Sequence, residues 1–179
     1  MNKQLDSERT LIVLSSFLRG GEAHATLIDR GNGLIFDDVN NISWIKDADV
    51  SGVNNWSNQV AWAAAFSLAG FDDFRLASID ELASLYGQLP GASGSNKTGD
   101  ISPFEDIQSF YWSGTEFDAV NVWVFNFGNG VQFPDFKFDD VYGWAVRPGD
   151  SLAVVPEPAS ILLLGAGLIG LLGVRRLRR

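Results

Sequence analysis

The sequence predicts an α+β domain in which two early helices precede a late antiparallel sheet. An alanine-rich stretch and a capping box, both helix signals, fall between residues 58 and 86. Short aromatic and β-branched runs, which are strand signals, gather after residue 110. Helices and strands that occupy separate parts of a chain are typical of α+β domains. The chain has 179 residues, so we expect one such domain, over residues 26–150.

The first elements of the domain are predicted to be short strands. Residues 26–33 form a strand and a Gly-Asn-Gly turn, and the apolar runs at residues 34–37 and 42–45 predict two more strands with a polar turn between them. Residues 47–57 are then expected to form a polar loop that carries Trp56.

Two helices are predicted next. The pattern of residues 58–69 indicates a helix that Gly70 is placed to cap. In a capping box, a serine hydroxyl and a glutamate carboxylate satisfy each other's exposed backbone N–H groups, and Ser78 with Glu81 fits this pattern. We expect the second helix to end at Gly87. Its apolar face is formed by Ile79, Leu82, Leu85 and Tyr86.

The remainder of the domain is predicted to be β-rich. Residues 91–99 consist of Gly, Ser, Ala, Asn, Lys and Thr and indicate a flexible loop. Strands are expected at residues 110–113, 121–127, 131–133 and 143–148, with Gly-Asn-Gly making a hairpin turn before the third of these.

Composition limits the partners of this domain. Residues 26–154 contain six Lys and Arg against 18 Asp and Glu, which gives a formal charge of −12, compared with −9 for the whole chain. A surface this acidic repels nucleic acid and anionic lipid but tolerates divalent cations. The chain has no cysteine, which excludes disulfides and thiol chemistry.

The C-terminal residues have the composition of a membrane segment. A Pro-Glu-Pro sequence in residues 151–158 leads into an apolar stretch, residues 159–174, and then a basic end, residues 175–179. Sixteen helical residues extend about 24 Å, slightly less than the roughly 30 Å hydrocarbon core of a bilayer. We expect a marginal transmembrane helix with its basic end in the cytoplasm. The orienting residues are Arg175, Arg176, Arg178 and Arg179.

This order of parts resembles the PEP-CTERM sorting tail of exported bacterial proteins. The resemblance rests on the apolar span, the terminal arginines and the motif Val155, Pro156, Glu157, Pro158. It implies processing by an exosortase, transient anchoring in the inner membrane, and a final place at the cell surface or in the extracellular matrix of a Gram-negative bacterium. Residues 1–25 fit a degraded signal peptide, because the apolar run at 11–18 and Ala23-His24-Ala25 are accompanied by acidic residues.

Several motifs in the domain occur in the order of one family. They are Asp29-Arg30-Gly31-Asn32-Gly33-Leu34-Ile35-Phe36-Asp37, Ile42-Ser43-Trp44, Trp62-Ala63, Phe74-Arg75-Leu76-Ala77-Ser78-Ile79-Asp80-Glu81-Leu82, Tyr111-Trp112-Ser113-Gly114-Thr115-Glu116 and Val146-Arg147-Pro148. The chain here resembles the domain at the C-terminus of bacterial collagen-like adhesins. That family is similar to C-type-lectin-like and formylglycine-generating-enzyme-like folds. The resemblance implies a surface module, of a kind that in some cases binds polysaccharide. The enzyme branch works through cysteines, so we expect a non-catalytic protein.

Arginines and tryptophans are the first candidate ligand contacts. Arg75 and Arg147 could each bind a ligand carboxylate in a bidentate manner, but an internal ion pair with Glu116 or an aspartate is the favoured interpretation. Most of the six tryptophans are expected in the core. Trp56 and Trp123 are the two that we expect to be exposed and able to stack on a sugar.

Acidic loops are the candidate metal sites. Asp135, Asp139 and Asp140 form one such loop, and Asp47 with Asp49 forms another. Calcium prefers oxygen ligands of this kind, although solvated turn aspartates are the favoured interpretation because no EF-hand spacing is present.

Together these observations predict an exported, non-catalytic surface or matrix protein that associates with polysaccharide. One alternative is a secreted glycan hydrolase that uses two carboxylates, for which the candidate pairs are Asp80 with Glu81 and Glu116 with Asp118. Helix capping already explains Glu81, and a turn explains Asp118. The other alternative is a structural matrix protein without a discrete ligand.

Overall fold

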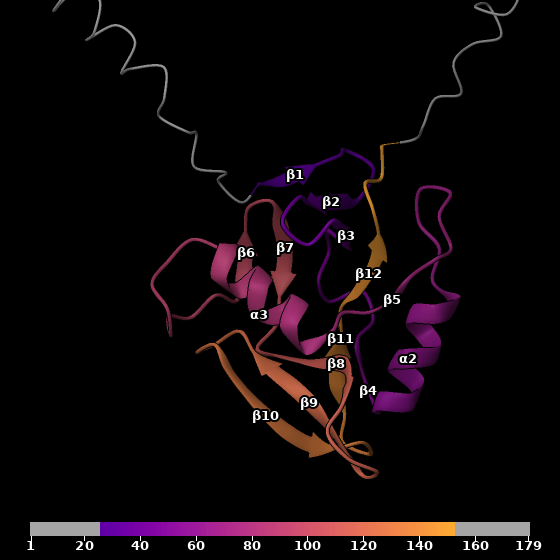
Figure 1. The fold of residues 1–179 in the computed structure, drawn as a ribbon, viewed down its shortest axis with the longest axis vertical. Helices are drawn as coiled ribbons and strands as arrows, with labels where there is room; N and C mark the ends of the chain where they lie inside the picture. The colour runs from indigo at the N-terminus through magenta and orange to yellow at the C-terminus, as the bar shows by residue number, and fades with distance from the viewer. Residues whose placement is uncertain (1–25, 153–179) are drawn as a thin grey trace, which may run out of the picture.

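The computed structural model describes residues 26–152, which form two five-stranded sheets, a two-stranded hairpin and two helices (Figure 1). The strands are β1 (Leu27–Asp29), β2 (Leu34–Asp37), β3 (Ile42–Ile45), β4 (Val53–Asn54), β5 (Arg75–Leu76), β6 (Gly99–Ile101), β7 (Phe104–Ile107), β8 (Phe110–Glu116), β9 (Asn121–Asn126), β10 (Val131–Phe136), β11 (Val141–Gly143) and β12 (Ala145–Pro148). The helices are α2 (Trp56–Ala65) and α3 (Ile79–Gln88). The α+β class is therefore confirmed.

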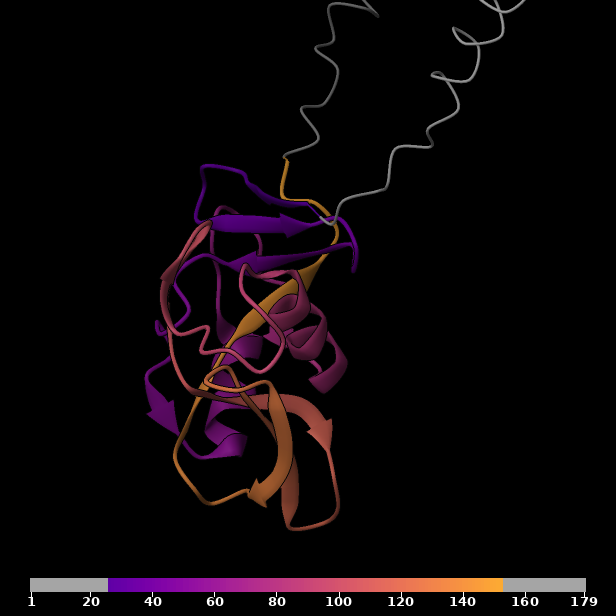
Figure 2. The ribbon, with the colours of Figure 1, turned by 90° about the vertical axis from the view of Figure 1, so that its left-hand side faces the viewer.

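The first sheet joins the two ends of the domain. Its order is β1-β2-β3-β12-β5 and all of its pairs are antiparallel. The last strand, β12, lies between β3 and β5, with Val146 opposite Trp44 on one side and Arg75 on the other. Figure 2 shows β1 and β2 of this sheet at one end of the molecule and the β9–β10 hairpin at the other end. The early strands thus belong to the same sheet as the final strand.

The second sheet has the order β10-β9-β8-β11-β4 and is mixed. β11 runs parallel to β8, with Tyr142 opposite Tyr111, so the prediction of a wholly antiparallel late sheet is wrong at this pair. The predicted strand at residues 143–148 is divided, because β11 ends at Gly143 and β12 begins at Ala145 in the other sheet. Trp144, between the two strands, is fully buried where the chain passes from one sheet to the other.

Helix α2 begins and ends earlier than its sequence pattern indicates. Asn55 is the N-cap, and its side chain accepts a hydrogen bond from the Asn58 backbone N–H. The helix ends because Phe66 is extended at ψ 142°, with its ring packed edge-on against Phe74 at 5.2 Å. The prediction that Gly70 caps this helix is wrong.

Helix α3 begins with the predicted capping box, which is confirmed. Its end is not at Gly87, which lies within the helix. Lys97 reaches back to the C-terminal turn, where its ammonium group donates to the carbonyl oxygens of Tyr86 and Leu89 at 2.6 and 2.8 Å. The Lys97 residue is 2% exposed, so the loop predicted to be flexible is fastened to the helix end at this position. The β6–β7 hairpin that follows was not predicted.

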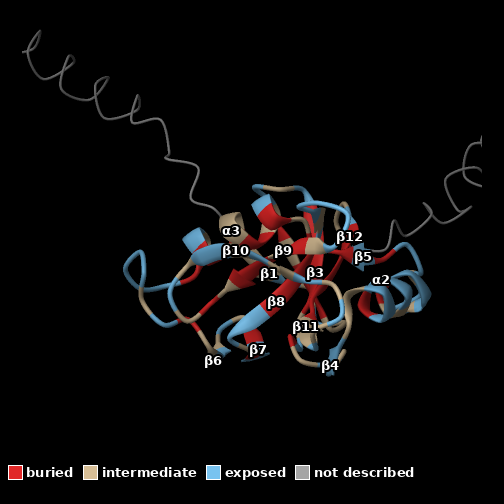
Figure 3. Cartoon of the chain, turned by 90° about the horizontal axis from the view of Figure 1, so that it is seen from below, coloured by how far each residue is buried: buried red, intermediate tan, exposed pale blue. Residues whose placement is uncertain are grey.

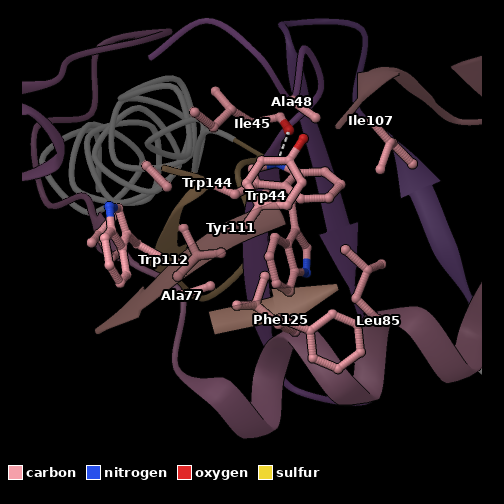
Figure 4. Close-up of a cluster of buried hydrophobic side chains, with 14 of the residues drawn as sticks. Trp44, Ile45, Ala48, Ala77, Leu85, Ile107, Tyr111, Trp112, Phe125 and Trp144 are labelled. Carbon is pink, nitrogen blue, oxygen red and sulfur yellow. Dashed lines mark hydrogen bonds between the residues drawn. The ribbon is translucent and has the colours of Figure 1, made fainter. Parts of the chain in front are cut away.

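The core lies between the sheets and against α3 (Figure 3). Trp144 is at its centre, in edge or tilted contact with Trp44 at 5.2 Å and with Tyr111 at 5.1 Å (Figure 4). Its indole N–H donates to the Ile45 carbonyl at 2.9 Å. Because each buried indole has a hydrogen-bond partner, burial of these rings carries no unpaired polar group. The fully buried tryptophans are Trp44, Trp112 and Trp144.

Several predictions concern residues outside the described range. They are the signal peptide at 1–25, the sorting motif, the apolar stretch at 159–174 and the terminal arginines. Within residues 26–152, no helix is long and apolar enough to cross a membrane.

Candidate functional site

Two of the predicted ligand-contact residues, Trp56 and Arg75, line the same pocket. The pocket has a volume of about 350 Å³ and lies between α2, β5 and β8. Its size is within the about 300–1,000 Å³ typical of sites for small ligands. Its lining residues are Trp56, Val60, Arg75, Leu76, Ser78, Gly114 and Glu116. We call it the Trp56–Arg75 pocket.

Trp56 is the first residue of α2 and is half-buried, rather than part of a polar loop. Its indole N–H donates to the Ser113 carbonyl at 3.0 Å, which fixes the ring orientation. The Lys137 ammonium group lies 4.9 Å from the ring centroid, within cation–π range. Since the only polar atom of the side chain is already bonded, Trp56 offers a ligand an apolar surface.

Arg75 is held by Glu81, and the predicted partner Glu116 is wrong for this residue. Its guanidinium group makes two bonds to the Glu81 carboxylate, at 2.8 and 2.7 Å, and a third to the Leu76 carbonyl at 3.1 Å. The bond to Glu81 raises the pKa of Arg75. Three of the five guanidinium N–H groups are engaged in these bonds, so two are available to hydroxyl groups of a ligand.

Glu81 has two structural roles, as the capping residue of α3 and as the partner of Arg75. Its carboxylate accepts from the Ser78 backbone N–H at 2.7 Å as well as from Arg75. Burial alone would raise the pKa of the Glu81 carboxyl, but the bonds from Arg75 and Ser78 outweigh burial and lower this pKa. With both oxygens occupied, Glu81 is unsuited to a role as an acid or base.

Glu116 forms the acidic rim of the Trp56–Arg75 pocket. Its carboxylate accepts a hydrogen bond from the Lys137 ammonium group, which also donates to the Ala119 carbonyl. The side chain of Glu116 is 55% exposed and keeps access to solvent. Its predicted catalytic partner, Asp118, instead accepts from the backbone N–H groups of Val120 and Asn121 and holds the turn before β9.

Arg147 forms the internal ion pair that was the favoured interpretation. It is 8% exposed and donates twice to the Asp73 carboxylate, at 2.7 and 3.1 Å. Its guanidinium carbon also lies 3.8 Å from the ring centroid of Phe71. These bonds from Arg147 lower the pKa of Asp73. Arg147 does not line the Trp56–Arg75 pocket, although the neighbouring Val146 pairs with Arg75 across β12 and β5.

Trp123 does not line this pocket either. It is half-buried on β9, with its ring edge-on to Phe117 at 5.1 Å. Trp56 and Trp123 therefore do not share one stacking platform.

The carboxylates that could hold a metal ion include the predicted pair Asp47 and Asp49 and not the predicted loop of Asp135, Asp139 and Asp140. Asp47, Asp49 and Asp106 each place one carboxylate oxygen within 4.8 Å of the other two. Among residues 26–152, this is the group of carboxylates that has this geometry. Burial and the nearby Asp47 raise the pKa of Asp49. Asp106 was missed because it comes from β7, and its proximity depends on the Asp47–Glu105 bridge. In the other predicted loop, which contains Asp135, Asp139 and Asp140, desolvation and a hydrogen bond shared with Asp135 raise the pKa of Asp139.

All six basic residues of the described domain are already engaged. Five form ion pairs with carboxylates, and Lys97 is buried against backbone carbonyls. The ion-paired residues are Arg30, Lys46, Arg75, Lys137 and Arg147. Among residues 26–152, the surface therefore offers no unneutralised cation for binding an anion.

A second pocket, also of about 350 Å³, lies between β4, β11 and the start of β8. Of the residues predicted to form sites, it includes Asp140 only. The exposed aromatic residue of this pocket is Phe110. Residue 110 begins a predicted strand, but its residue type alone did not indicate a site.

Two family models match this chain. Residues 154–179 match the PEP-CTERM protein-sorting motif, which implies an exported protein that is anchored in the membrane transiently and processed by an exosortase. No curated protein matches the chain. Residues 33–147 match the Lcl C-terminal domain, over more than half of the sequence and nearly all of the described fold. The chain belongs to the family of the Lcl C-terminal domain.

Proposed function

We propose that the domain is a non-catalytic, C-type-lectin-like module that binds polysaccharide through the Trp56–Arg75 pocket. The observation that carries this proposal is that an aromatic residue, an arginine and a glutamate, Trp56, Arg75 and Glu116, line one pocket. Membership in the family of the Lcl C-terminal domain supports the lectin-like part of this proposal, because that family resembles C-type-lectin-like folds.

The lining of the pocket matches the chemistry of a sugar ring. A sugar has an apolar C–H face and an edge of hydroxyl groups, and the Trp56 ring can cover the first of these. The free N–H groups of Arg75 donate to hydroxyl oxygens, while the Glu116 carboxylate accepts from hydroxyl protons. Because Glu81 neutralises Arg75, the pocket favours neutral sugar units over carboxylated ones.

The same lining favours binding over hydrolysis. Glycoside hydrolysis requires two carboxyl groups on either side of the scissile bond, and Glu116 is the one carboxylate among the lining residues. The presence of a pocket of ligand size also favours a binding module over a structural matrix protein without a ligand.

A glycan-binding measurement with full-length protein in mild detergent tests this proposal. Neutral polysaccharides and their oligomers are titrated against wild type, Trp56→Phe and Trp56→Ala, with Phe138→Ala as a control for loss of an exposed aromatic ring outside both pockets. We expect Trp56→Ala to weaken binding about tenfold, equivalent to about 1.4 kcal/mol. Trp56→Phe should retain most of the affinity, since a ring remains.

Thermal unfolding of each variant separates a binding defect from a folding defect. If Trp56→Ala melts like Trp56→Phe yet binds neutral glycans as wild type does, the pocket is not the site. If wild-type protein retains no neutral polysaccharide at all, the proposed function is wrong.

We further propose that release from the membrane deposits the protein at the surface or in the polysaccharide matrix of a Gram-negative bacterium. The intact mass of the protein from its producing cells should then lack the residues after the Pro156–Pro158 region. A mass that still includes Arg179, in cells with active exosortase, contradicts this part.

A further inference from the structure

The second pocket differs from the first in its charge. Its lining residues are Val53, Gln108, Ser109, Phe110, Asp140, Val141 and Tyr142, and this set contains a carboxylate and no cation. We propose that this pocket, the Asp140 pocket, binds a protonated amino sugar, the cationic unit of a polysaccharide with free amino groups.

Aromatic rings form two walls of the Asp140 pocket. Phe110 is 42% exposed and packs edge-on against Phe133, with ring centroids 6.0 Å apart. Tyr142 is half-buried and packs at a tilt against the fully buried Tyr111. Neighbouring rings therefore support both walls. Aromatic faces attract cations and also cover the apolar face of a sugar.

The carboxylate and its surroundings supply the charge that complements an ammonium group. Asp140 is exposed at the rim, and its charge is among the causes that raise the pKa of Asp139. The charge of the lining is therefore negative, because Asp140 is its one ionised side chain. Gln108 is held in place by a side-chain hydrogen bond to the backbone carbonyl of Asp106.

No basic residue counters this charge. The lining includes none, and the six cations of the described domain are paired or buried as set out above. A domain with a formal charge of −12 repels carboxylated or sulfated chains at long range. It attracts a chain that bears ammonium groups. The amide of Gln108 and the hydroxyl of Ser109 remain beside the rings as polar groups of the kind that orient sugar hydroxyls.

This inference does not depend on the Trp56–Arg75 pocket. The two pockets share no lining residue and lie against opposite ends of β8, so each can be tested separately. Two sites of different preference on one domain would let it hold a polymer of mixed acetylated and free amino sugars.

The test uses two probes with the same sugar backbone that differ in whether the amino groups are free or acetylated. A β-1,4-linked glucosamine trimer carries free amino groups, and its N-acetylated counterpart is neutral. Each is titrated by calorimetry into full-length protein in mild detergent at moderate salt. We expect the glucosamine trimer to bind at least about tenfold more tightly than the acetylated trimer. Equal affinities would overturn the proposal.

Matched variants locate the binding. Asp140→Asn and Asp72→Asn each remove one exposed carboxylate, but only the first lies in the pocket. Asp140→Asn should weaken glucosamine-trimer binding about fivefold or more, and Asp72→Asn less than twofold. Equal losses would show attraction spread over the acidic surface and would overturn a discrete site.

The aromatic variants separate this site from the first one. Phe110→Ala should weaken binding of the glucosamine trimer, while Trp56→Ala should leave it unchanged. If Trp56→Ala abolishes it and Phe110→Ala does not, the amino sugar binds in the Trp56–Arg75 pocket and the present inference fails. Wild-type protein that binds the glucosamine trimer but no neutral glycan would count against the proposed function instead.

Discussion

The ammonium group of Lys97 lies 4.3 Å from the ring centroid of Tyr86 and 2.6 Å from the carbonyl oxygen of the same residue. The ring and the carbonyl oxygen together hold a charge that has no carboxylate partner within the described residues. Tyr86 in turn donates its hydroxyl to the Ser95 carbonyl at 2.6 Å. The loop over residues 91–99 is therefore ordered by polar contacts with the end of α3.

Replacement of Lys97 by methionine should destabilise the domain by about 1–3 kcal/mol. The apolar stem is kept, but the carbonyls of Tyr86 and Leu89 lose their donor, and unsatisfied buried acceptors cost about this much. Urea unfolding gives the value. Lys46→Met, which removes the partly exposed ion pairs to Asp29 and Glu105, is the control and should cost clearly less than Lys97→Met. Equal costs would mean that Lys97 is not the anchor of the loop.

Gly130→Ala should be much more costly than Gly70→Ala. Both glycines have positive φ, at 77° and 86°, so each substitution carries a backbone penalty of about 1 kcal/mol. A Cβ at Gly130 would also lie 2.6 Å from the buried ring of Tyr86, whereas a Cβ at Gly70 meets nothing within 4 Å. We expect a loss of about 2–4 kcal/mol for Gly130→Ala, measured by thermal or urea unfolding. Similar losses at both positions would contradict the packing of the hairpin turn on α3.

Asp37→Asn should destabilise the fold by about 2–4 kcal/mol. Asp37 is fully buried, and its carboxylate accepts from the Trp44 indole at 3.2 Å, the Gln88 amide and the backbone of the following turn. An asparagine would replace one acceptor by a donor that faces other donors. Asp72→Asn, at an exposed position, serves as the control. If Asp37→Asn lowers the free energy of unfolding no more than the control does, the hydrogen bonds to the Asp37 carboxylate are not needed for stability.

The Asp73–Arg147 pair predicts a pH dependence. Because Arg147 lowers the pKa of Asp73, the ionised carboxyl stabilises the folded state above its unfolded pKa of 3.8, and this contribution is lost as the pH falls through the lower folded pKa. Because the Asp73 side chain is 45% exposed and screened by solvent, Asp73→Asn should cost no more than about 1 kcal/mol near neutral pH, and less as the pH falls below 3.8. Urea unfolding at several pH values measures it. A difference that stays constant on acidification would contradict the pairing.

Local interactions were predictable from the sequence, and long-range ones were not. The capping box at Ser78 and Glu81 spans one helical turn, so its pattern alone identifies it. The same box predisposes Glu81 to hold Arg75, yet Glu116 was expected in that role. The division of residues 143–148 between two sheets follows from burial of Trp144 at the junction, which no local pattern indicates.

The candidate sites were also predictable only in their local features. Trp56 and Arg75 were singled out separately, because residue type alone shows that each can contact a ligand. Their place in one pocket depends on how α2 packs against β5 and β8. The carboxylate group of Asp47, Asp49 and Asp106 also depends on a tertiary contact, since β7 supplies its third member.

The position of β12 has a mechanical consequence. The chain leaves the described domain directly after β12, which is hydrogen-bonded to β3 on one side and to β5 on the other. Arg30 adds a side-chain bond to Asp150 at 2.9 Å, just beyond the end of the strand. Of the strands that line the two pockets, β4, β8 and β11 belong to the other sheet, and β5 is the neighbour of β12. The β9–β10 hairpin of that other sheet lies at the opposite end of the molecule from β1 and β2 (Figure 1, Figure 2). Tension between a bound polymer and the C-terminal attachment would therefore load β12 in shear, the direction in which its hydrogen bonds must break together.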